Sequence, residues 1–306
     1  MSLTTESRGA PSTTVAESQR SSVDFSRDLE GLDALELAEH RSARGARRVW
    51  ATLWPQLAAV GIALGVWQIV VWSGWKPPYV LPPPSAVAQQ LWRSLTDGSL
   101  MGGLQTTMAR AGVGFALAVI IGLSVGIPVS QVSPLRRAVG SLITGLQTMP
   151  SIAWFPLAIL LFQISEGAIL FVVVLGAAPA IANGVIAGAD SIPKQIRQAG
   201  TVMGATGLRY YREVVVPGSV PGFVSGLKQG WAFAWRSLMA GELLVIVAGR
   251  TSVGVQLQVA RDLSDPAALV ATMVVILVVG IVVDTLVFGS IERAVRARWG
   301  LTPTTH

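Results

Sequence analysis

One long apolar run contains three ionisable residues, although a charged group in an apolar segment carries a high free-energy cost. Lys228, Arg236 and Glu242 fall within 219–247, and such groups usually face a partner or a water-filled path. Arg236 lies deep in the run, where its guanidinium can bind an oxyanion through paired hydrogen bonds. An internal ion pair of Arg236 with Glu242, or with Asp284 of the next run, explains it equally well. Lys228 lies nearer the start of the run, so we expect it to extend its ammonium toward the membrane surface.

The chain offers few groups for catalysis or metal binding. It has no cysteine, and its two histidines, His40 and His306, lie in the polar ends of the sequence. Neither can join a buried metal or acid/base cluster. The chain also lacks the G-x-x-x-x-G-K-[ST] loop that cradles nucleotide phosphates. We therefore expect no enzyme activity, no metal site and no cofactor in this chain.

The composition is that of a membrane protein, because 51% of the residues are hydrophobic and only 13% are charged. Apolar runs of about 20 residues recur, each long enough to cross a bilayer as a helix. They predict an all-α, polytopic membrane protein with about six spans, at 53–73, 108–129, 142–163, 167–188, 219–247 and 267–290. Pro150 and Pro156 interrupt the third run. A broken helix is tolerated only inside protein or beside a water-filled cavity, so this run is a candidate pore-lining element.

Two regions differ in character. Residues 1–45 are polar and predict a disordered cytoplasmic tail, whereas 46–306 form the membrane domain. Lysines and arginines concentrate before the first span and after the second, fourth and sixth, which places both termini in the cytoplasm. Arg110 is assigned to the opposite side, where charges are fewer. This bias also explains the net charge of +6, so no nucleic-acid partner is required.

The same topology places the loop at about 189–217 in the cytoplasm. Ser191 can cap a short helix whose first turn holds Pro193. Gly204 can adopt the left-handed conformation that ends such a helix. The small residues Ala199 and Gly200 would allow another surface to approach closely. The glycines Gly112, Gly114, Gly122 and Gly126 of the second span are expected to mark close helix packing.

This loop resembles the cytoplasmic signature of the permease subunits of bacterial ATP-binding-cassette (ABC) importers of the type I, or MetI-like, fold. That signature reads E-A-A, three residues, G, nine residues, then I-x-L-P. The corresponding residues here are Gln198, Ala199, Gly200, Gly204, Val214, Val216 and Pro217. Gln198 replaces the usual acid and Gly200 the second alanine. In the family this segment is the coupling helix, which docks on the ATPase subunit.

Further motifs resemble the permeases for nitrate, sulfonates and taurine, over residues 50–300. They are the proline-rich stretch 76–87, the start of the second span at 110–115, the broken third helix at 149–157, and 235–242 in the fifth span. By this resemblance Pro150, Trp235, Arg236 and Glu242 are candidate residues of the translocation path.

The resemblance implies partners and a location. Two copies of the permease, two copies of an ATPase that binds ATP and Mg²⁺, and an extracytoplasmic solute-binding protein would assemble at the bacterial cytoplasmic membrane. The cargo would be a small anion such as an aliphatic sulfonate, taurine or nitrate. A thiamine precursor or another small heterocycle is the alternative within the fold. An ATP-independent secondary transporter would show repeat symmetry, and a membrane enzyme would need clustered catalytic residues; the sequence shows neither.

Overall fold

A computed structural model of the chain describes residues 54–299. The described chain falls into two parts, the helix Trp54–Trp72 and a helical bundle that starts at Gly74. The first helix has 19 residues and is apolar enough to cross a membrane, which confirms the predicted run 53–73. The predicted N-terminal tail and both histidines lie outside the described residues.

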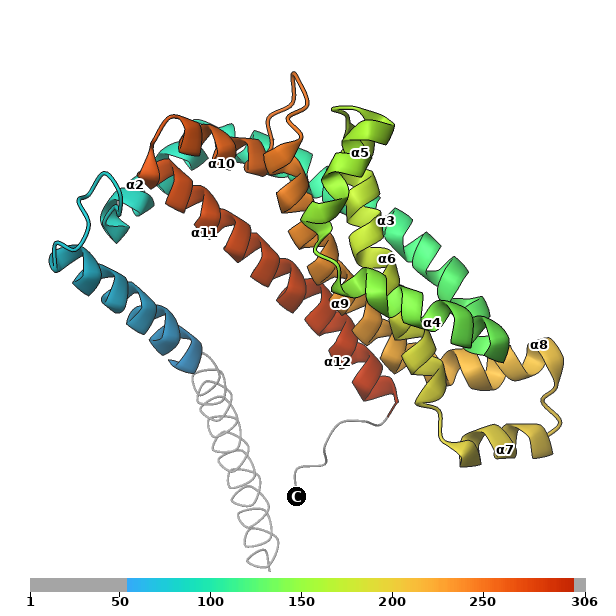
Figure 1. Cartoon of the computed structure of the whole chain (residues 1–306). Helices are drawn as coiled ribbons and strands as arrows, with labels where there is room; N and C mark the ends of the chain where they lie inside the picture. The colour runs from blue at the N-terminus through green and yellow to red at the C-terminus, as the bar shows by residue number, and fades with distance from the viewer. Residues whose placement is uncertain (1–53, 300–306) are drawn as a thin grey trace, which may run out of the picture. The chain divides into compact units, whose positions relative to one another are not determined.

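The regular structure between residues 54 and 299 is helical throughout (Figure 1). The bundle consists of α2 (Pro84–Thr96), α3 (Ser99–Gln131), α4 (Ser133–Thr148), η1 (Ser151–Trp154), α5 (Phe155–Phe162), α6 (Glu166–Asp190), α7 (Lys194–Val202), α8 (Gly207–Tyr210), η2 (Tyr211–Val215), α9 (Val216–Leu244), α10 (Val253–Asp262), α11 (Pro266–Val283), η3 (Asp284–Phe288) and α12 (Gly289–Arg298). α7 and α8 lie at one end of the bundle, and α5 and α10 lie at the other (Figure 1).

Fewer helices qualify as membrane spans than the sequence predicted. Within the described residues, four are long and apolar enough: Trp54–Trp72, α3, α6 and the continuous stretch Pro266–Arg298. α4 and the η1–α5 helix make a fifth if the bent pair is one span. The predicted run that does not qualify is the fifth, 219–247, which corresponds to α9. α9 has 29 residues, but its lysine, arginine, glutamate and many glycines make it too polar to qualify alone.

The third predicted span is broken, as its prolines indicated. Ser133–Thr148 and Ser151–Phe162 meet at an angle of 102°. Pro150 lies at the break in an extended conformation, with φ −59° and ψ 130°. Pro156 falls in the first turn of α5, where its missing N–H costs no helical hydrogen bond.

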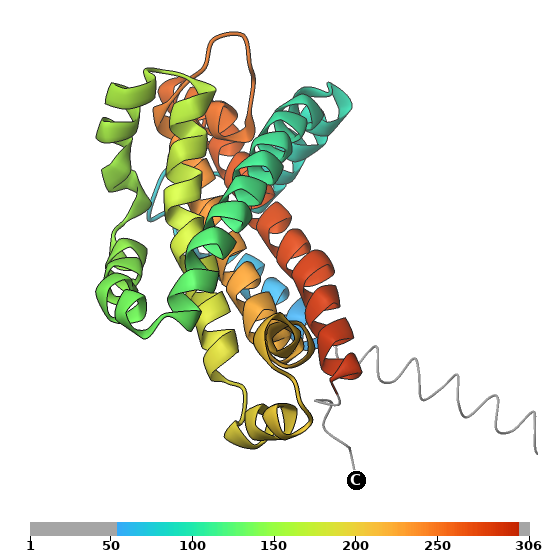
Figure 2. The ribbon, with the colours of Figure 1, turned by 90° about the vertical axis from the view of Figure 1, so that its right-hand side faces the viewer.

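α6 is the central helix, because it packs against both α3 and α9. Figure 2 shows α3 crossing α6. Glycines of α3 allow the contact: a Cβ on Gly114 would lie 2.7 Å from Val173, and one on Gly122 would lie 2.8 Å from Ile181. The predicted packing role is therefore confirmed for Gly114, Gly122 and Gly126. It is wrong for Gly112, which has open space where a Cβ would be.

α6 and α9 are in backbone contact. Gly184 faces Gly226, and Gly188 faces Gly222, so closely that a Cβ on any of them would overlap the other helix. Each helix thus carries glycines four residues apart, the spacing that brings membrane helices closest together. The two helices run antiparallel, since Gly241 near the end of α9 meets Ile169 near the start of α6.

Two of the long helices contain a π-helical turn. α8, η2 and α9 form one continuous helix from Gly207 to Leu244, and α11, η3 and α12 form another. The η2 turn comes just before Pro217, which has no N–H and crowds the carbonyl four residues earlier. A π turn accommodates that crowding, because its hydrogen bonds span five residues.

Candidate functional site

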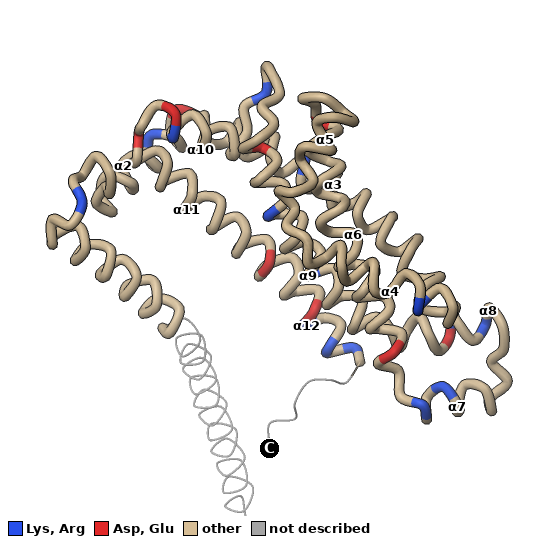
Figure 3. The backbone as a smooth tube through the Cα atoms, viewed as in Figure 1, with Lys and Arg blue, Asp and Glu red and all other residues tan. Residues whose placement is uncertain are grey.

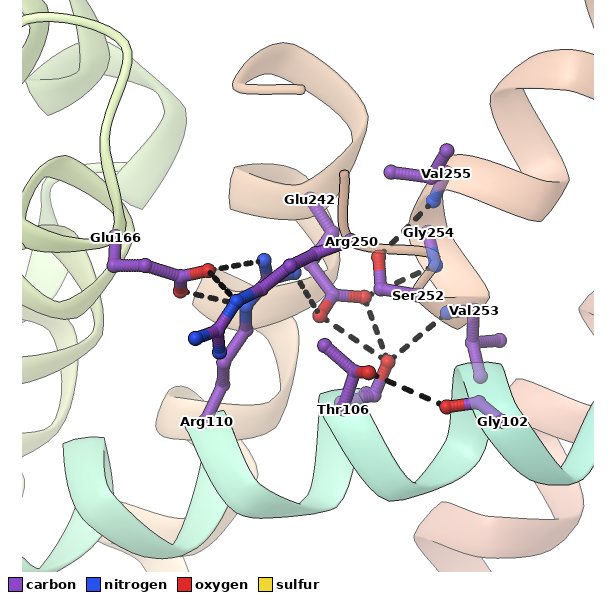
Figure 4. A network of polar contacts seen from close by, with 11 residues as sticks. Gly102, Thr106, Arg110, Glu166, Glu242, Arg250, Ser252, Val253, Gly254 and Val255 are labelled. Atoms are coloured by element: carbon purple, nitrogen blue, oxygen red, sulfur yellow. Dashed lines mark hydrogen bonds and ion pairs between the residues drawn. The ribbon is translucent and has the colours of Figure 1, made fainter. Parts of the chain in front are cut away.

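A network of charges joins three helices (Figure 4). It lies at the end of the bundle opposite α7, because Glu166 begins α6 and α7 follows the other end of that helix. Arg110 of α3 donates two parallel hydrogen bonds to Glu166 at the start of α6, with distances of 2.8 and 2.7 Å. Nη1 of Arg110 donates to Oε1 of Glu242, near the end of α9, at 2.9 Å. The side chain of Arg110 is 5% exposed and that of Glu242 is fully buried. A second arginine, Arg250, is largely exposed, and its Nε lies 3.8 Å from Oε1 of Glu166.

Both oxygens of the Glu242 carboxylate are occupied. The hydroxyl of Thr107 lies 2.9 Å from Oε2 and 3.1 Å from Oε1, and it accepts a hydrogen bond from the N–H of Val253 at 3.0 Å. The N–H of Gly254 donates to Oε2 at 3.0 Å. A Cβ on Gly254 would overlap the side chain of Glu242, so glycine is required for this approach.

The network acts as a clamp. It holds the ends of α3, α6 and α9 and the first turn of α10, and its two arginines balance its two glutamates. Because both oxygens of Glu242 are hydrogen-bonded and its side chain is fully buried, Glu242 cannot contact substrate in this conformation. If Glu242 takes part in transport, the hydrogen bonds and the ion pair of this network would have to break and re-form.

The structure corrects several predictions. Arg110 is buried within α3, because that helix begins at Ser99 and not near 108. The expected ion pairs of Arg236 with Glu242 or Asp284 are wrong. Glu242 binds Arg110, and Asp284 lies 3.4 Å from Lys228.

Lys228 also differs from its prediction. Instead of extending to the membrane surface, its ammonium lies between Asp284 of η3 and Glu292 of α12, at 3.4 and 3.8 Å. The two contacts tie α9 to the helix that begins with α11.

Arg236 lies on an exposed stripe of α9. Its Nε donates to the carbonyl of Ala232 at 3.0 Å, and its guanidinium lies 4.6 Å from the centre of the Phe233 ring. It forms no ion pair among residues 54–299. Ser225, Gln229, Ala232 and Arg236 recur at steps of four, three and four residues, and all four are exposed. They give α9 a polar or small face that the bundle leaves uncovered.

Trp235 lies on the neighbouring face of α9, at a cleft between α9 and α11. The cleft has a volume of about 610 Å³, and its lining is mainly apolar, with Met239, Met273 and Leu277 among its residues. The rings of Trp231 and Trp235 stack at a centroid distance of 6.1 Å. Of the predicted path residues, Trp235 and Arg236 are thus adjacent, whereas Glu242 is buried in the clamp.

The predicted coupling segment is a helix followed by a well-defined turn. α7 spans Lys194–Val202. Gly204 is left-handed, with φ +83°, as its position predicted. The N–H of Gly204 donates to Thr201 at 3.0 Å, and the N–H of Ala205 donates to Gly200 at 3.0 Å. These two bonds form a Schellman motif, which satisfies the last carbonyls of the helix.

The start of this segment differs from the prediction. Ser191 does not cap α7, because its hydroxyl donates back to Gly188 at 2.8 Å. Pro193 occupies the N-cap position. Arg197 donates to the carbonyl of Ala189, which ties α7 to the end of α6.

Three of the seven motif residues, Gly200, Val214 and Pro217, make contacts inside the chain. A Cβ on Gly200 would lie 2.6 Å from Cγ2 of Val214, so the close approach expected of Gly200 is made to this chain's own η2 turn. The carbonyl of Pro217 accepts a hydrogen bond from Nε1 of Trp299 at 3.0 Å. In contrast, Gln198, Ala199 and Val216 are exposed.

Sequence comparison identifies a family. Residues 118–297, more than half of the chain, match the family described as binding-protein-dependent transport system inner membrane component. The nitrate import permease protein NrtB of Synechocystis is 26% identical over 238 residues, which cover 75% of this chain and 84% of that protein. The taurine transport system permease protein TauC of Escherichia coli is 24% identical over 243 residues, covering 76% and 87%. The riboflavin transport system permease protein RibX of Chloroflexus aurantiacus is 29% identical over 250 residues, covering 80% and 91%.

Solved structures agree on the fold. An inward-facing structure of the MetNI methionine ABC transporter matches with a TM-score of 0.55 at 23% identity, and the match covers 64% of this chain and 95% of that one. An amino acid ABC transporter crystallised with histidines matches with a TM-score of 0.53 at 16% identity. The predicted MetI-like fold is confirmed.

Proposed function

Because the chain belongs to the family of binding-protein-dependent transport system inner membrane components, it is a multi-pass permease subunit of an ABC importer, and we propose that its cargo is a small anion. An aliphatic sulfonate, taurine or nitrate fits this class. The relatives named for nitrate and taurine import support the proposal.

The observation that carries the proposal is Arg236 on the exposed stripe of α9. Arg236 has no acidic partner in the part of the chain that the structure describes. Such a guanidinium is costly at the depth of a bilayer, unless a water-filled path or a ligand solvates it. Gln229 and Ser225 extend the same face by about three turns toward α7. If two copies of the chain place these stripes opposite each other, the path between them carries two guanidinium groups for an oxyanion.

The remaining components are part of the same proposal. Two ATPase subunits would supply the energy by binding ATP and Mg²⁺, and a solute-binding protein would deliver the cargo. α7 would receive the movement of the ATPase at the cytoplasmic side. Both chain termini would lie on that side too, as the distribution of lysine and arginine predicts.

The experiment is ATP-driven uptake into proteoliposomes that contain the permease, its ATPase and its binding protein. Labelled nitrate, taurine, an alkanesulfonate, riboflavin and a thiamine-precursor pyrimidine are compared. We expect one of the anions to accumulate, and Arg236→Ala to lower its uptake by about tenfold or more, which corresponds to about 1.4 kcal/mol. Arg236→Lys should retain part of it, and Arg261→Ala, an exposed arginine of α10, serves as the matched control. Normal anion uptake by Arg236→Ala would leave Arg236 only its packing on Phe233.

A flat heterocycle is the second candidate, and one observation favours it. Trp235, which stacks on the buried Trp231, lines a mainly apolar cleft of about 610 Å³, which suits a ring better than a small inorganic anion. The relative named for riboflavin transport agrees with this choice. Uptake of riboflavin or the pyrimidine, lost in Trp235→Ala and kept in Arg236→Ala, would select this candidate.

A further inference from the structure

Two hollows beside α9 form one continuous groove. The apolar cleft between α9 and α11 has a volume of about 610 Å³. A charged pocket of about 360 Å³ follows it, and the two share Asp284 and Thr285 in their linings. The groove therefore changes in character along its length, from an apolar cleft to a pocket that contains Lys228, Arg293 and Arg296.

The charged pocket lies at the α7 end of the bundle, which the predicted topology places in the cytoplasm. Trp299, which follows α12, donates a hydrogen bond to Pro217 at the start of α9. Figure 3 shows an uncharged α11 followed by charges of both signs toward α12. On α11 the apolar cleft extends from Met273 to Asp284, which are about 17 Å apart along the helix axis. One leaflet contributes a similar depth, about 15 Å, to the hydrocarbon core of a bilayer.

The apolar cleft is narrower than a helix. Over about 17 Å its volume gives a mean cross-section of about 36 Å², whereas a helix with a diameter of about 10 Å occupies about 80 Å². Met273 and Leu277, which line the cleft, are 52% and 61% exposed. The cleft therefore has the proportions of a site for extended hydrocarbon chains.

The charged pocket carries one excess positive charge, because its lining contains three cations and two acids: Lys228, Arg293, Arg296, Asp284 and Glu292. Lys228 and Arg296 both pair with Glu292. Arg293 is exposed and donates to the hydroxyl of Ser290 at 3.0 Å, but it forms no ion pair with any residue between 54 and 299. A guanidinium binds phosphate oxygens through paired hydrogen bonds. Basic pockets between membrane helices on the cytoplasmic side bind anionic lipid head groups.

We propose that the groove binds an anionic phospholipid of the cytoplasmic leaflet. Its phosphate lies at Arg293, and its acyl chain lies in the apolar cleft along Leu277 and Trp235. A chain in this position excludes the flat heterocycle considered above from the cleft. The choice of leaflet rests on the predicted topology, whereas the binding does not depend on which cargo the permease carries.

The test is native mass spectrometry of the full-length permease in detergent, equilibrated with equimolar phosphatidylglycerol and phosphatidylcholine. We expect the wild type to retain phosphatidylglycerol severalfold more than phosphatidylcholine, and Arg293→Gln to lose this preference. Arg137→Gln, an exposed arginine of α4 on the same predicted side of the membrane, should keep it. Glu292→Gln should strengthen the preference, because it removes an acid from the pocket. Equal retention of the two lipids by the wild type would overturn the proposal.

A second pair of variants tests the apolar cleft. Leu277→Trp fills the cleft and should lower the retention of both lipids severalfold. Val278→Trp changes an exposed neighbour that does not line the cleft, and it should bind lipid as the wild type does. A loss of phosphatidylglycerol in Arg293→Gln without a loss in Leu277→Trp would assign the charged pocket to a free anion, and the lipid proposal would be wrong.

Crosslinking identifies what occupies the cleft. A photo-reactive phenylalanine analogue at position 273, activated in the detergent-solubilised complex, should form an adduct with phosphatidylglycerol. An adduct with a second copy of the chain or with residues 54–72 would show that a helix covers the cleft, and an adduct with added riboflavin would favour the heterocycle. Either result would overturn the proposal. Failure of the proposed cargo looks different, since it would appear only as missing anion uptake in proteoliposomes and would leave lipid retention unchanged.

Discussion

At the end of the bundle that holds Arg110, Glu166 and Glu242, each charged group is neutralised inside the chain, whereas at the α7 end Lys194 and Arg212 have no partner among residues 54–299. The first end is buried and saturated with hydrogen bonds. The second exposes both charge and large apolar side chains. Groups that satisfy each other contribute to the stability of the subunit, and groups left unsatisfied on a rigid support indicate where another molecule binds.

The largest expected effect is at the clamp. Arg110→Met removes the partner of two carboxylates, one of them fully buried, and should lower the free energy of unfolding by about 3–5 kcal/mol. Denaturant titration of the purified permease in detergent measures this. Arg250→Met should cost no more than about 1 kcal/mol, because its contact with Glu166 is largely exposed. Equal losses in the two variants would remove the distinction between buried and exposed members of the network.

The next effect is steric and lies at the same end. Gly254→Ala places a Cβ against the side chain of Glu242 and should lower the free energy of unfolding by about 1–3 kcal/mol. Gly112→Ala faces open space in the middle of α3 and should instead be neutral or stabilise by about 0.5–1 kcal/mol. Thermal unfolding of both variants provides the test, and an undisturbed Gly254→Ala would show that the clamp can relax.

A smaller effect is expected at the turn after α7. Gly204→Ala forces a residue with a Cβ into the left-handed region, at a cost of about 1–2 kcal/mol. No neighbouring atom lies near that Cβ, so the loss should stay local and reduce ATP-driven uptake more than the melting temperature. Gly204→Asn should retain activity, since asparagine tolerates this conformation. A global loss of stability in Gly204→Ala would mean that the turn supports the whole bundle.

The smallest expected effect on stability is at Val202, and it tests the contrast between the two ends of the bundle most directly. Val202→Asp changes an almost fully exposed side chain, so the free energy of unfolding of the isolated permease should stay within about 0.5 kcal/mol of the wild type. Differential scanning fluorimetry of the permease without its ATPase measures this. A clear destabilisation would mean that Val202 contributes to the subunit's own folding.

Some features could be predicted because the signal was local. α6 was predicted at 167–188 and occupies Glu166–Asp190, since a long uninterrupted apolar run defines a span. The left-handed Gly204 and the break at Pro150 followed from the conformational preferences of glycine and proline.

The buried clamp could not be found in this way. Gly102, Gly103, Thr106 and Thr107 dilute the apolar signal at the start of α3. The sequence pattern therefore predicts a span from 108 and assigns Arg110 to the opposite side of the membrane as a loop charge. The signal that could have found it was an arginine in one apolar run and a glutamate in another. Which helices meet is a long-range property, and the pairing of Glu242 with Arg110 in place of Arg236 depends on it.

The glycine contact between α6 and α9 has a consequence for biogenesis. α9 is too polar to qualify as a span on its own, and each lysine or arginine at the centre of a helix opposes membrane insertion by about 2.5–3.5 kcal/mol. α6 is synthesised first and is strongly apolar, and its glycines offer α9 a complementary surface. We therefore expect α9 to leave the translocon only when it is paired with α6, as the second arm of a helical hairpin, so that a bulky residue at Gly184 or Gly226 would send the subunit to quality-control proteases before an importer could assemble.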